Sequence, residues 1–170
     1  MTEIAYMREC RLSDEQLISF FEMLCAPDQT EWDYEPAVFD RSDVAREIRE
    51  FRQRPSQERN HGFWALDGNR VIGFAGMYQL PELSRQHCAE LSFGVAKSFT
   101  RQGLGYRLVC AALAKAREIG LRRIEADCFA DNLGAIALLR KAGLQEEGVR
   151  VGAMMKEGRL RDIRLFGLTL

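Results

Sequence analysis

Several features that define particular protein classes are missing from this sequence. Its five cysteines are odd in number and scattered, and none forms a Cys-x-x-Cys pair, so neither a disulfide framework nor a metal site is expected. No apolar run approaches the roughly 20 residues that a membrane span needs, and the first residues lack a basic and then apolar leader. The net charge of −1 gives no general attraction to nucleic acid or to an anionic membrane. A cytoplasmic protein is the simplest expectation.

The composition is that of an ordinary globular protein. Of the 170 residues, 46% are hydrophobic and 29% are charged. This length fits a single domain over residues 1–170 with a sizeable core. Neither an internal repeat nor a low-complexity tract divides the chain.

Hydrophobic periodicity predicts eleven elements in the order β-α-α-β-β-β-α-β-α-β-β. Strands are expected at 3–9, 63–66, 71–75, 87–96, 124–129, 148–155 and 160–168, and helices after Ser13 and Asp40 and over 103–119 and 133–142. Ser13 and Gln16 suit a capping box, Pro27 is expected to stop the first helix, and Gly120 suits a left-handed C-cap. The predicted fold class is α/β, with a mixed central sheet of about seven strands flanked by helices.

The most informative segment is a predicted strand that runs through a polar turn into a helix with two glycines in its first turn, Gly103 and Gly105. The start of a helix offers unpaired N–H groups and the positive end of the peptide dipoles, so this segment suits a phosphorylated ligand. A Walker loop would end in Gly-Lys-Ser/Thr, and a dinucleotide fingerprint would have a third glycine where Leu108 stands. Neither pattern is present, so the glycines by themselves do not name the ligand.

A second motif narrows the choice. The run from Thr100 to Gly105 is similar to the pyrophosphate loop Arg/Gln-x-x-Gly-x-Gly/Ala, with Thr100 at the first position. About 30 residues later, the run from Asn132 to Leu144 is similar to Asn-x-x-Ala-x-x-Leu-Tyr-x-Lys-x-Gly-Phe, with Leu139 in place of Tyr. Together they resemble the GNAT superfamily of acetyl-CoA-dependent N-acetyltransferases, over about residues 60–168. The resemblance implies an acyl-CoA N-acyltransferase fold and acetyl-CoA as co-substrate, without a metal.

Two branches of the superfamily share features with this chain. The end of the sequence, from Glu147 through Arg150, Gly158 and Asp162, is similar to the branch that acetylates ribosomal-protein N-termini and small amines. The run from Ala89 to Phe93 looks more like the branch that acetylates protein lysines. The acceptor is therefore a small-molecule, peptide or protein amine whose identity stays open.

The resemblance places one set of residues against acetyl-CoA. A bulge in the strand, with which Gly94 is compatible, would free backbone groups for the pantetheine arm. The expected contacts are Phe93, Val95, Arg101, Gln102, Gly103, Leu104, Gly105, Tyr106, Asn132 and Lys141. A general acid is missing, because Leu139 cannot protonate the thiolate as the usual Tyr does. Cys128 is expected near this place, as a buried structural cysteine.

Glu90 is the candidate catalytic base. An alkylamine with a pKa near ~10 is almost fully protonated at neutral pH, so a carboxylate or a water chain must accept its proton before it attacks. Glu90 alternates with Ser92 and Gly94 on one face of an otherwise apolar strand, and it matches a glutamate that serves as base in the lysine branch. The alternative is a salt-bridged strand glutamate. His61 and His87 are isolated and are expected in loops or at strand edges.

The acceptor is expected on the acidic and aromatic segment 25–40. Glu31, Asp33 and Tyr34 are its candidate substrate-binding residues, because acidic and aromatic side chains suit a cationic amine. A solvated acidic loop is the alternative.

Two other functions stay open: a non-catalytic acyl-CoA-binding sensor, which Thr100 and Leu139 favour, and an interaction module that docks basic peptides. Edge strands of the closing hairpin are expected to allow a homodimer.

Overall fold

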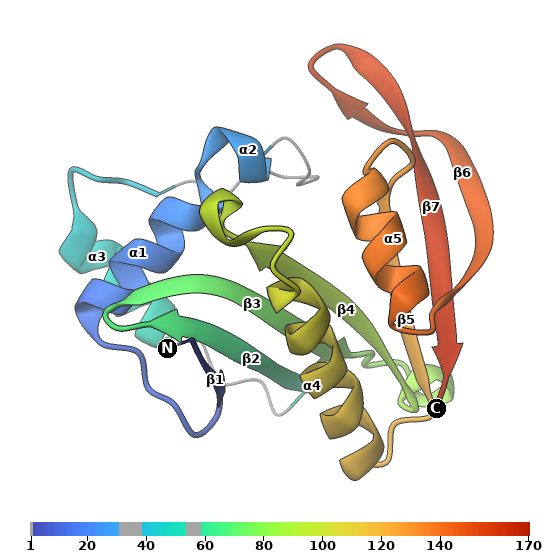
Figure 1. The fold of residues 1–170 in the computed structure, drawn as a ribbon, viewed down its shortest axis with the longest axis horizontal. Helices are drawn as coiled ribbons and strands as arrows, with labels where there is room; N and C mark the ends of the chain where they lie inside the picture. The colour runs from blue at the N-terminus through green and yellow to red at the C-terminus, as the bar shows by residue number, and fades with distance from the viewer. Residues whose placement is uncertain (1, 31–38, 54–58) are drawn as a thin grey trace.

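The computed structural model describes residues 2–30, 39–53 and 59–170. They form a seven-stranded mixed sheet in the order β1-β2-β3-β4-β5-β7-β6 (Figure 1). The strands are β1 (Glu3–Tyr6), β2 (Asn60–Asp67), β3 (Arg70–Gln79), β4 (Cys88–Val95), β5 (Arg123–Phe129), β6 (Gln145–Lys156) and β7 (Arg159–Thr169). The helices are α1 (Asp14–Leu24), α2 (Pro27–Thr30), α3 (Val44–Gln53), α4 (Leu104–Glu118) and α5 (Leu133–Lys141), with short 3-10 turns η1 (Leu83–Arg85) and η2 (Lys97–Phe99).

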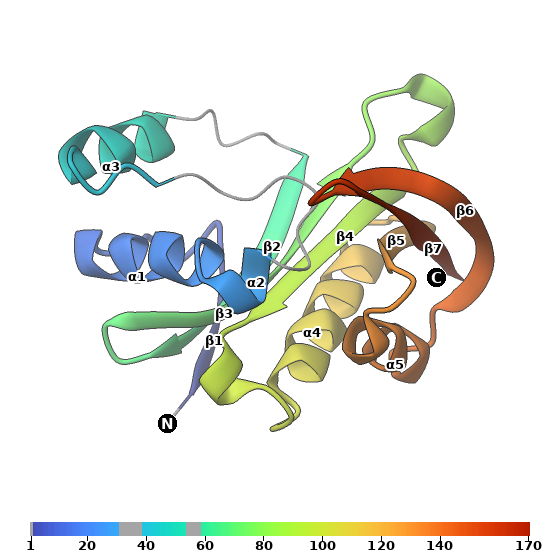
Figure 2. The ribbon, with the colours of Figure 1, turned by 90° about the horizontal axis from the view of Figure 1, so that it is seen from above.

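The helices cover both faces of the sheet and bury two hydrophobic cores. Figure 2 shows α1 and α3 on one side of the sheet and α4 and α5 on the other. On the first side, Leu17 and Phe20 of α1 pack with Trp64 and Val71 of the sheet. On the second side, Leu108 of α4 belongs to the larger core that also contains residues of α5 and of the central strands. None of the helices in the described part of the chain is long and apolar enough to cross a membrane.

The predicted order of the main elements is confirmed, and the differences have local causes. Ser13 and Gln16 form the expected capping box, and Gly120 adopts the left-handed conformation with φ 80°. Pro27 does not simply stop α1, which ends at Leu24. It begins α2, where a missing N–H costs nothing because the first N–H groups of a helix are unpaired anyway. The turns η1 and η2 and the helix α2 are too short to leave a periodic signal.

The sheet is held together unevenly at its centre. β4 pairs with β3 over seven residues, from Ala89 to Val95, and β5 pairs with β7 over its whole length. Between β4 and β5 the parallel pairing covers three positions and ends at Glu90 and Glu125. Beyond that point the two strands diverge, as Figure 1 shows. We call this divergence the β4–β5 split.

The edge strand β6 is irregular. Its register with β7 shifts between Glu146 and Gly148 and again between Arg150 and Met154, where the Gly152 N–H donates to Asp162 Oδ1 at 2.7 Å. Bulges of this kind distort an edge and hinder strand addition. Homodimer formation through the closing hairpin therefore stays a prediction.

His61 is not the loop or edge residue that its isolation in the sequence suggests. It lies within β2, an interior strand, and only 9% of its surface is exposed. Its Nδ1 is 2.7 Å from the Tyr6 hydroxyl, and the two rings stack. Burial, followed by the charges of Arg8 and Lys115, lowers the pKa of His61 below its usual 6.5.

This lowered pKa predicts how stability depends on pH. The unfolded chain binds the His61 proton more readily, so its contribution to stability is complete above pH 6.5 and is lost as the pH falls toward the folded-state pKa. His61→Gln should therefore lose less stability than the wild type between pH 7.5 and pH 5. Urea unfolding at a series of pH values measures both slopes, and parallel slopes would contradict the assignment.

Candidate active site

The predicted phosphate-binding loop connects η2 to α4 and leaves the start of that helix open. Gly103 is the N-cap residue, with φ 78°, and no side chain caps the helix. Arg101 also has a positive φ, of 61°. The first N–H groups of α4 are therefore available to an anion from outside the chain. This arrangement fits the pyrophosphate of acetyl-CoA.

The two glycines of the loop have different physical roles. A Cβ on Gly103 would meet none of the described residues within 4 Å, so this glycine is needed for its left-handed backbone and for the open space beside it. A Cβ on Gly105 would lie 2.8 Å from Leu138 Cδ1 and 3.5 Å from Val95 Cγ2. Gly105 is buried, so its missing side chain allows α5 and β4 to pack against α4. A contact of its backbone with the pyrophosphate stays a prediction.

Side chains of the loop stabilise its shape. The Thr100 hydroxyl donates to Lys97 O at 2.8 Å, and Gln102 Nε2 donates to Ser98 O at 3.0 Å. The Gln102 amide thus holds the turn, and a contact of Gln102 with acetyl-CoA stays a prediction. Arg101 is exposed and remains the candidate for a side-chain contact with phosphate.

The backbone of β4 presents polar groups to the β4–β5 split. The Ala96 N–H donates to Ile72 O and the Leu80 N–H donates to Cys88 O, both at 3.0 Å. Because bonding alternates along an antiparallel pair, even-numbered residues of β4 bond toward β3, and Phe93 and Val95 direct their N–H and C=O groups toward β5. Pairing with β5 has ended before these two residues. Their backbone groups therefore face the split.

The expected bulge in β4 is absent. The register between β3 and β4 runs without a shift from Gly73 opposite Val95 to Gln79 opposite Ala89. The split arises because β5 follows β7 away from β4, and an inserted residue is not needed. Gly94 has another role, because a Cβ there would lie 2.7 Å from Phe74 Cε1 and 3.0 Å from Gln29 Nε2.

The second motif forms the other wall beside the loop. Asn132 caps α5, with its Oδ1 accepting from the Ala135 N–H at 3.0 Å. Lys141 Nζ lies 4.4 Å from the centroid of the Tyr106 ring, which brings the end of α5 to the start of α4. Leu139 is fully buried in the core, so this position contributes no acid. Burial raises the pKa of the Cys128 thiol to about 11, in agreement with a structural cysteine.

Glu90 lies where β4 and β5 part, on the face of the sheet opposite α4. It pairs with Glu125, so the two side chains share one face. Glu125 accepts from Arg85 at 2.6 Å and from Arg123 at 2.8 Å. Among the residues that the structure describes, Glu90 has no ion pair, and it is exposed. The salt-bridged strand glutamate of the alternative interpretation therefore finds no partner among the described residues.

The predicted acceptor residues Glu31, Asp33 and Tyr34 lie outside the described residues. At the end of the same segment, the Asp40 carboxylate accepts from the Ser42 N–H and hydroxyl and from Arg46 at 2.8 Å. The hydrogen bonds from Ser42 are the main cause that lowers the pKa of Asp40. These contacts occupy the Asp40 carboxylate at the start of α3, so we do not assign it to the binding of the acetyl acceptor.

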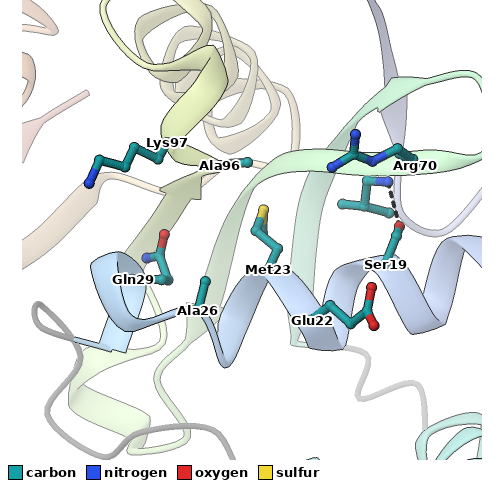
Figure 3. A pocket seen from close by; sticks show the side chains of 9 residues that line it. Ser19, Glu22, Met23, Ala26, Gln29, Arg70, Ala96 and Lys97 are labelled. Carbon is teal, nitrogen blue, oxygen red and sulfur yellow. Dashed lines mark hydrogen bonds between the residues drawn. The ribbon is translucent and has the colours of Figure 1, made fainter.

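A small cavity of ≈ 200 Å³ lies between α1, α2 and the ends of β3 and β4 (Figure 3). It is lined by Ser19, Glu22, Met23, Ala26, Gln29, Arg70, Val71, Ala96 and Lys97. Sites for ligands of drug size or larger measure about 300–1,000 Å³, so this cavity is too small for acetyl-CoA. One of its lining residues, Gln29, reaches from α2 to the face of Gly94 and so bears on the site.

Three residues near Glu90, and Gln29 beside Gly94, were not singled out as site residues from the sequence. Ser92 is exposed on the same face as Glu90, Tyr78 lies opposite Glu90 on β3, and Gly76 lies opposite Ser92. Strand alternation signals Ser92 beside Glu90. The contact of Gln29 with Gly94 joins residues that are 65 positions apart, so no local pattern could reveal it.

Comparison with known proteins agrees with this geometry. Residues 24–144 match the family model described as the acetyltransferase (GNAT) family. The uncharacterized N-acetyltransferase YdgE of Bacillus subtilis is 29% identical over 119 residues, which cover 69% of this chain and 74% of that protein. The uncharacterized N-acetyltransferase YycN of the same organism is 27% identical over 92 residues, which cover 53% of this chain and 59% of that protein.

Solved structures show the same fold. The ribosomal-protein-alanine N-acetyltransferase from Brucella melitensis superimposes with a TM-score of 0.80 at 22% identity, covering 100% of this chain and 99% of that one. A phosphinothricin acetyltransferase from Sinorhizobium meliloti, solved in complex with acetyl-CoA, gives a TM-score of 0.75 at 18% identity, covering 99% and 88%.

The packing of Gly105 generates a testable prediction. Gly105→Val should lower the free energy of unfolding by about 1–3 kcal/mol, because the added atoms overlap Leu138. Leu138→Ala in the same chain should recover part of this loss. Gly134→Val, on the exposed side of α5, is the control and should lose less than about 0.5 kcal/mol. Urea unfolding of the wild type and these three variants tests this, and equal losses at Gly105 and Gly134 would contradict it.

Proposed function

We propose that this chain, which belongs to the acetyltransferase (GNAT) family, transfers the acetyl group of acetyl-CoA directly to a primary amine. One observation carries the proposal. A single continuous segment, from Glu90 to Tyr106, supplies an exposed carboxylate, a strand edge that faces the β4–β5 split and an uncapped helix start. These are the parts that thioester aminolysis requires: a proton acceptor, backbone donors and an anion cradle.

Acetyl-CoA, when bound, supplies an activated thioester. The first N–H groups of α4 would hold its pyrophosphate, with Arg101 on the exposed side of the loop and Lys141 across from Tyr106. The backbone of Phe93 and Val95 would bind the pantetheine arm within the split. A backbone N–H directed at the thioester oxygen can contribute roughly 3 kcal/mol to the transition state, because negative charge develops there.

Glu90 would accept the proton of the incoming ammonium. Glu90 stands three residues before Phe93, about 10 Å along the strand. Its carboxylate therefore cannot directly reach an amine placed beside Phe93. Ser92 lies between them on the face of Glu90, and its hydroxyl, or a water beside it, would carry the proton over this distance. A leaving thiolate with a pKa near ~8.5 needs little help, which accommodates the buried Leu139.

The acceptor is proposed to be a small-molecule, peptide or protein amine. Thiol release from acetyl-CoA with polyamines, amino acids, N-terminal peptides and lysine peptides tests this. Release with any class establishes catalysis. Binding of acetyl-CoA with no release for any amine would instead support the sensor function, and binding of basic peptides that does not depend on acetyl-CoA would support the interaction module.

The cradle is tested at Gly103. Gly103→Val should weaken acetyl-CoA binding at least 100-fold, because the branched side chain fills the open space beside the loop and strains a φ of 78°. Gly120→Val is a matched control, since Gly120 has a φ of 80° and equally open surroundings at the other end of α4. Calorimetric titration with acetyl-CoA measures both. A similar loss in both variants would mean that backbone strain, and not the cradle, is responsible.

The base is tested at Glu90. Glu90→Gln should lower the rate of acetyl transfer at neutral pH by about 10²-fold or more, the scale of general-base catalysis, with little change in acetyl-CoA affinity. Glu118→Gln, at the exposed end of α4, should leave the rate unchanged. The pH–rate profile of each variant is the measurement, and an unaltered profile for Glu90→Gln would remove Glu90 from the mechanism.

A further inference from the structure

The face of β3 and β4 that carries Glu90 contains a strip of small residues. Gly62 of β2 lies opposite Gly76 of β3, and Gly76 lies opposite Ser92 of β4, so the three form one row across the sheet. Among the described residues, a Cβ on Gly76 would have only Ser92 Oγ within 4 Å, at 3.5 Å, and Ser92 itself is exposed. We call the surface over Gly76 and Ser92 the open strip.

Larger side chains bound the open strip on both sides. In the row on one side, Phe74 and Gln29 cover Gly94, with Phe20 of α1 packed edge-on against Phe74 at 5.7 Å. In the row on the other side, Tyr78 lies opposite Glu90. Each flanking row is two residues, about 6.6 Å, from the row of Gly76, so one alkyl chain fits along that row.

The two ends of the strip differ. At the β2 end, the Met7 sulfur lies only 2.6 Å from the position that a Cβ of Gly62 would take. Met7 therefore closes the strip there. At the β4 end, Ser92 borders the β4–β5 split, where pairing with β5 has already ended. From Ser92 to Gly62 the distance is two strand spacings, about 10 Å.

Charge favours a cation at the open end. Glu90 has no ion pair within the described part of the chain, whereas Glu125 is neutralised by Arg85 and Arg123. Tyr78, at 37% exposed, and Phe74 add aromatic faces along the strip. A group with a positive end and a slender apolar body therefore matches the strip.

We propose that the open strip binds the alkyl chain of the acceptor and selects a primary amine on an unbranched chain over an amine on a branched carbon. This inference rests on the proposed function. The chain lies over Gly76 between Phe74 and Tyr78, and the amine reaches the split beside Ser92 and Glu90. A lysine side chain and a free alkylamine share this chemistry, whereas the α-amino group of a protein N-terminus stands on a substituted carbon.

Thiol release at saturating acetyl-CoA tests the selection with matched acceptors. The panel contains the isomers n-butylamine and sec-butylamine, together with the amide of Nα-acetyl-lysine and a peptide with an N-terminal alanine. For the wild type, kcat/KM should be at least about 10-fold higher for n-butylamine than for sec-butylamine, and higher for the lysine amide than for the alanine peptide. A preference for the lysine amide over n-butylamine would point to peptide acceptors, and the reverse to free amines.

A variant that fills the strip tests its location. Gly76→Val should lower kcat/KM for the unbranched amines at least about 10-fold and leave the Kd of acetyl-CoA unchanged, because the side chain occupies the strip and not the split. Valine suits a strand, and among the described residues a Cβ here meets only Ser92 Oγ, at 3.5 Å. If Gly76→Val does not fold, Gly76→Ala replaces it and should show a smaller effect. Gly148→Val is the matched control on β6, three strands from β4, and should change neither constant.

The outcomes separate this inference from the proposed function. Acetyl transfer that favours sec-butylamine or the alanine peptide, or that is unaffected in Gly76→Val, would overturn the open strip while acetyl transfer itself stands. Bound acetyl-CoA with no thiol release for any amine would overturn both. A loss of acetyl-CoA binding in Gly76→Val would also overturn the inference, since it would place the cofactor on the strip.

Discussion

The parting of β4 from β5 is the constraint on which the rest of the site depends. β4 is paired with β3 along seven residues and β5 with β7 along seven, but only three pairs join β4 to β5. The sheet therefore consists of two well-paired halves that meet at a short seam. Backbone N–H and C=O groups on strand edges need hydrogen-bond partners. The edges at Phe93 and Val95 are thus suited to a ligand that carries amide groups of its own.

The two faces of the sheet complement this split. On the face of α4 and α5, apolar side chains from both halves share one core, so the halves stay together although their backbones separate. On the other face, α1 and its aromatic cluster cover β2 and β3, and Glu90 and Ser92 are left exposed. Ion pairs hold Glu125 and Arg123 beside the seam. The Glu90 and Glu125 carboxylates would repel each other across the β4–β5 pair, and of the two only Glu125 is neutralised.

Three glycines near the site show how far residue type can be interpreted alone. Gly103 needs a left-handed backbone, Gly105 makes room for Leu138, and Gly76 leaves a face of the sheet open. The spacing of Gly103 and Gly105 predicted a loop at a helix start, and the helix is there. It could not separate their roles, because the neighbour that Gly105 accommodates belongs to α5, more than 30 residues later.

The amino-acid sequence alone determined the order of the main helices and strands, the capping box of α1, the loop before α4 and the motif that places Asn132 at the start of α5. These features depend on periodicity and on contacts between residues a few positions apart. Only the tertiary structure decided where β4 leaves β5, that Gln29 lies over Gly94, that Glu90 is exposed without an ion pair in the described part of the chain, and that Leu139 is buried. Such features depend on which strands become neighbours, and contacts between distant segments leave no periodic trace in either one.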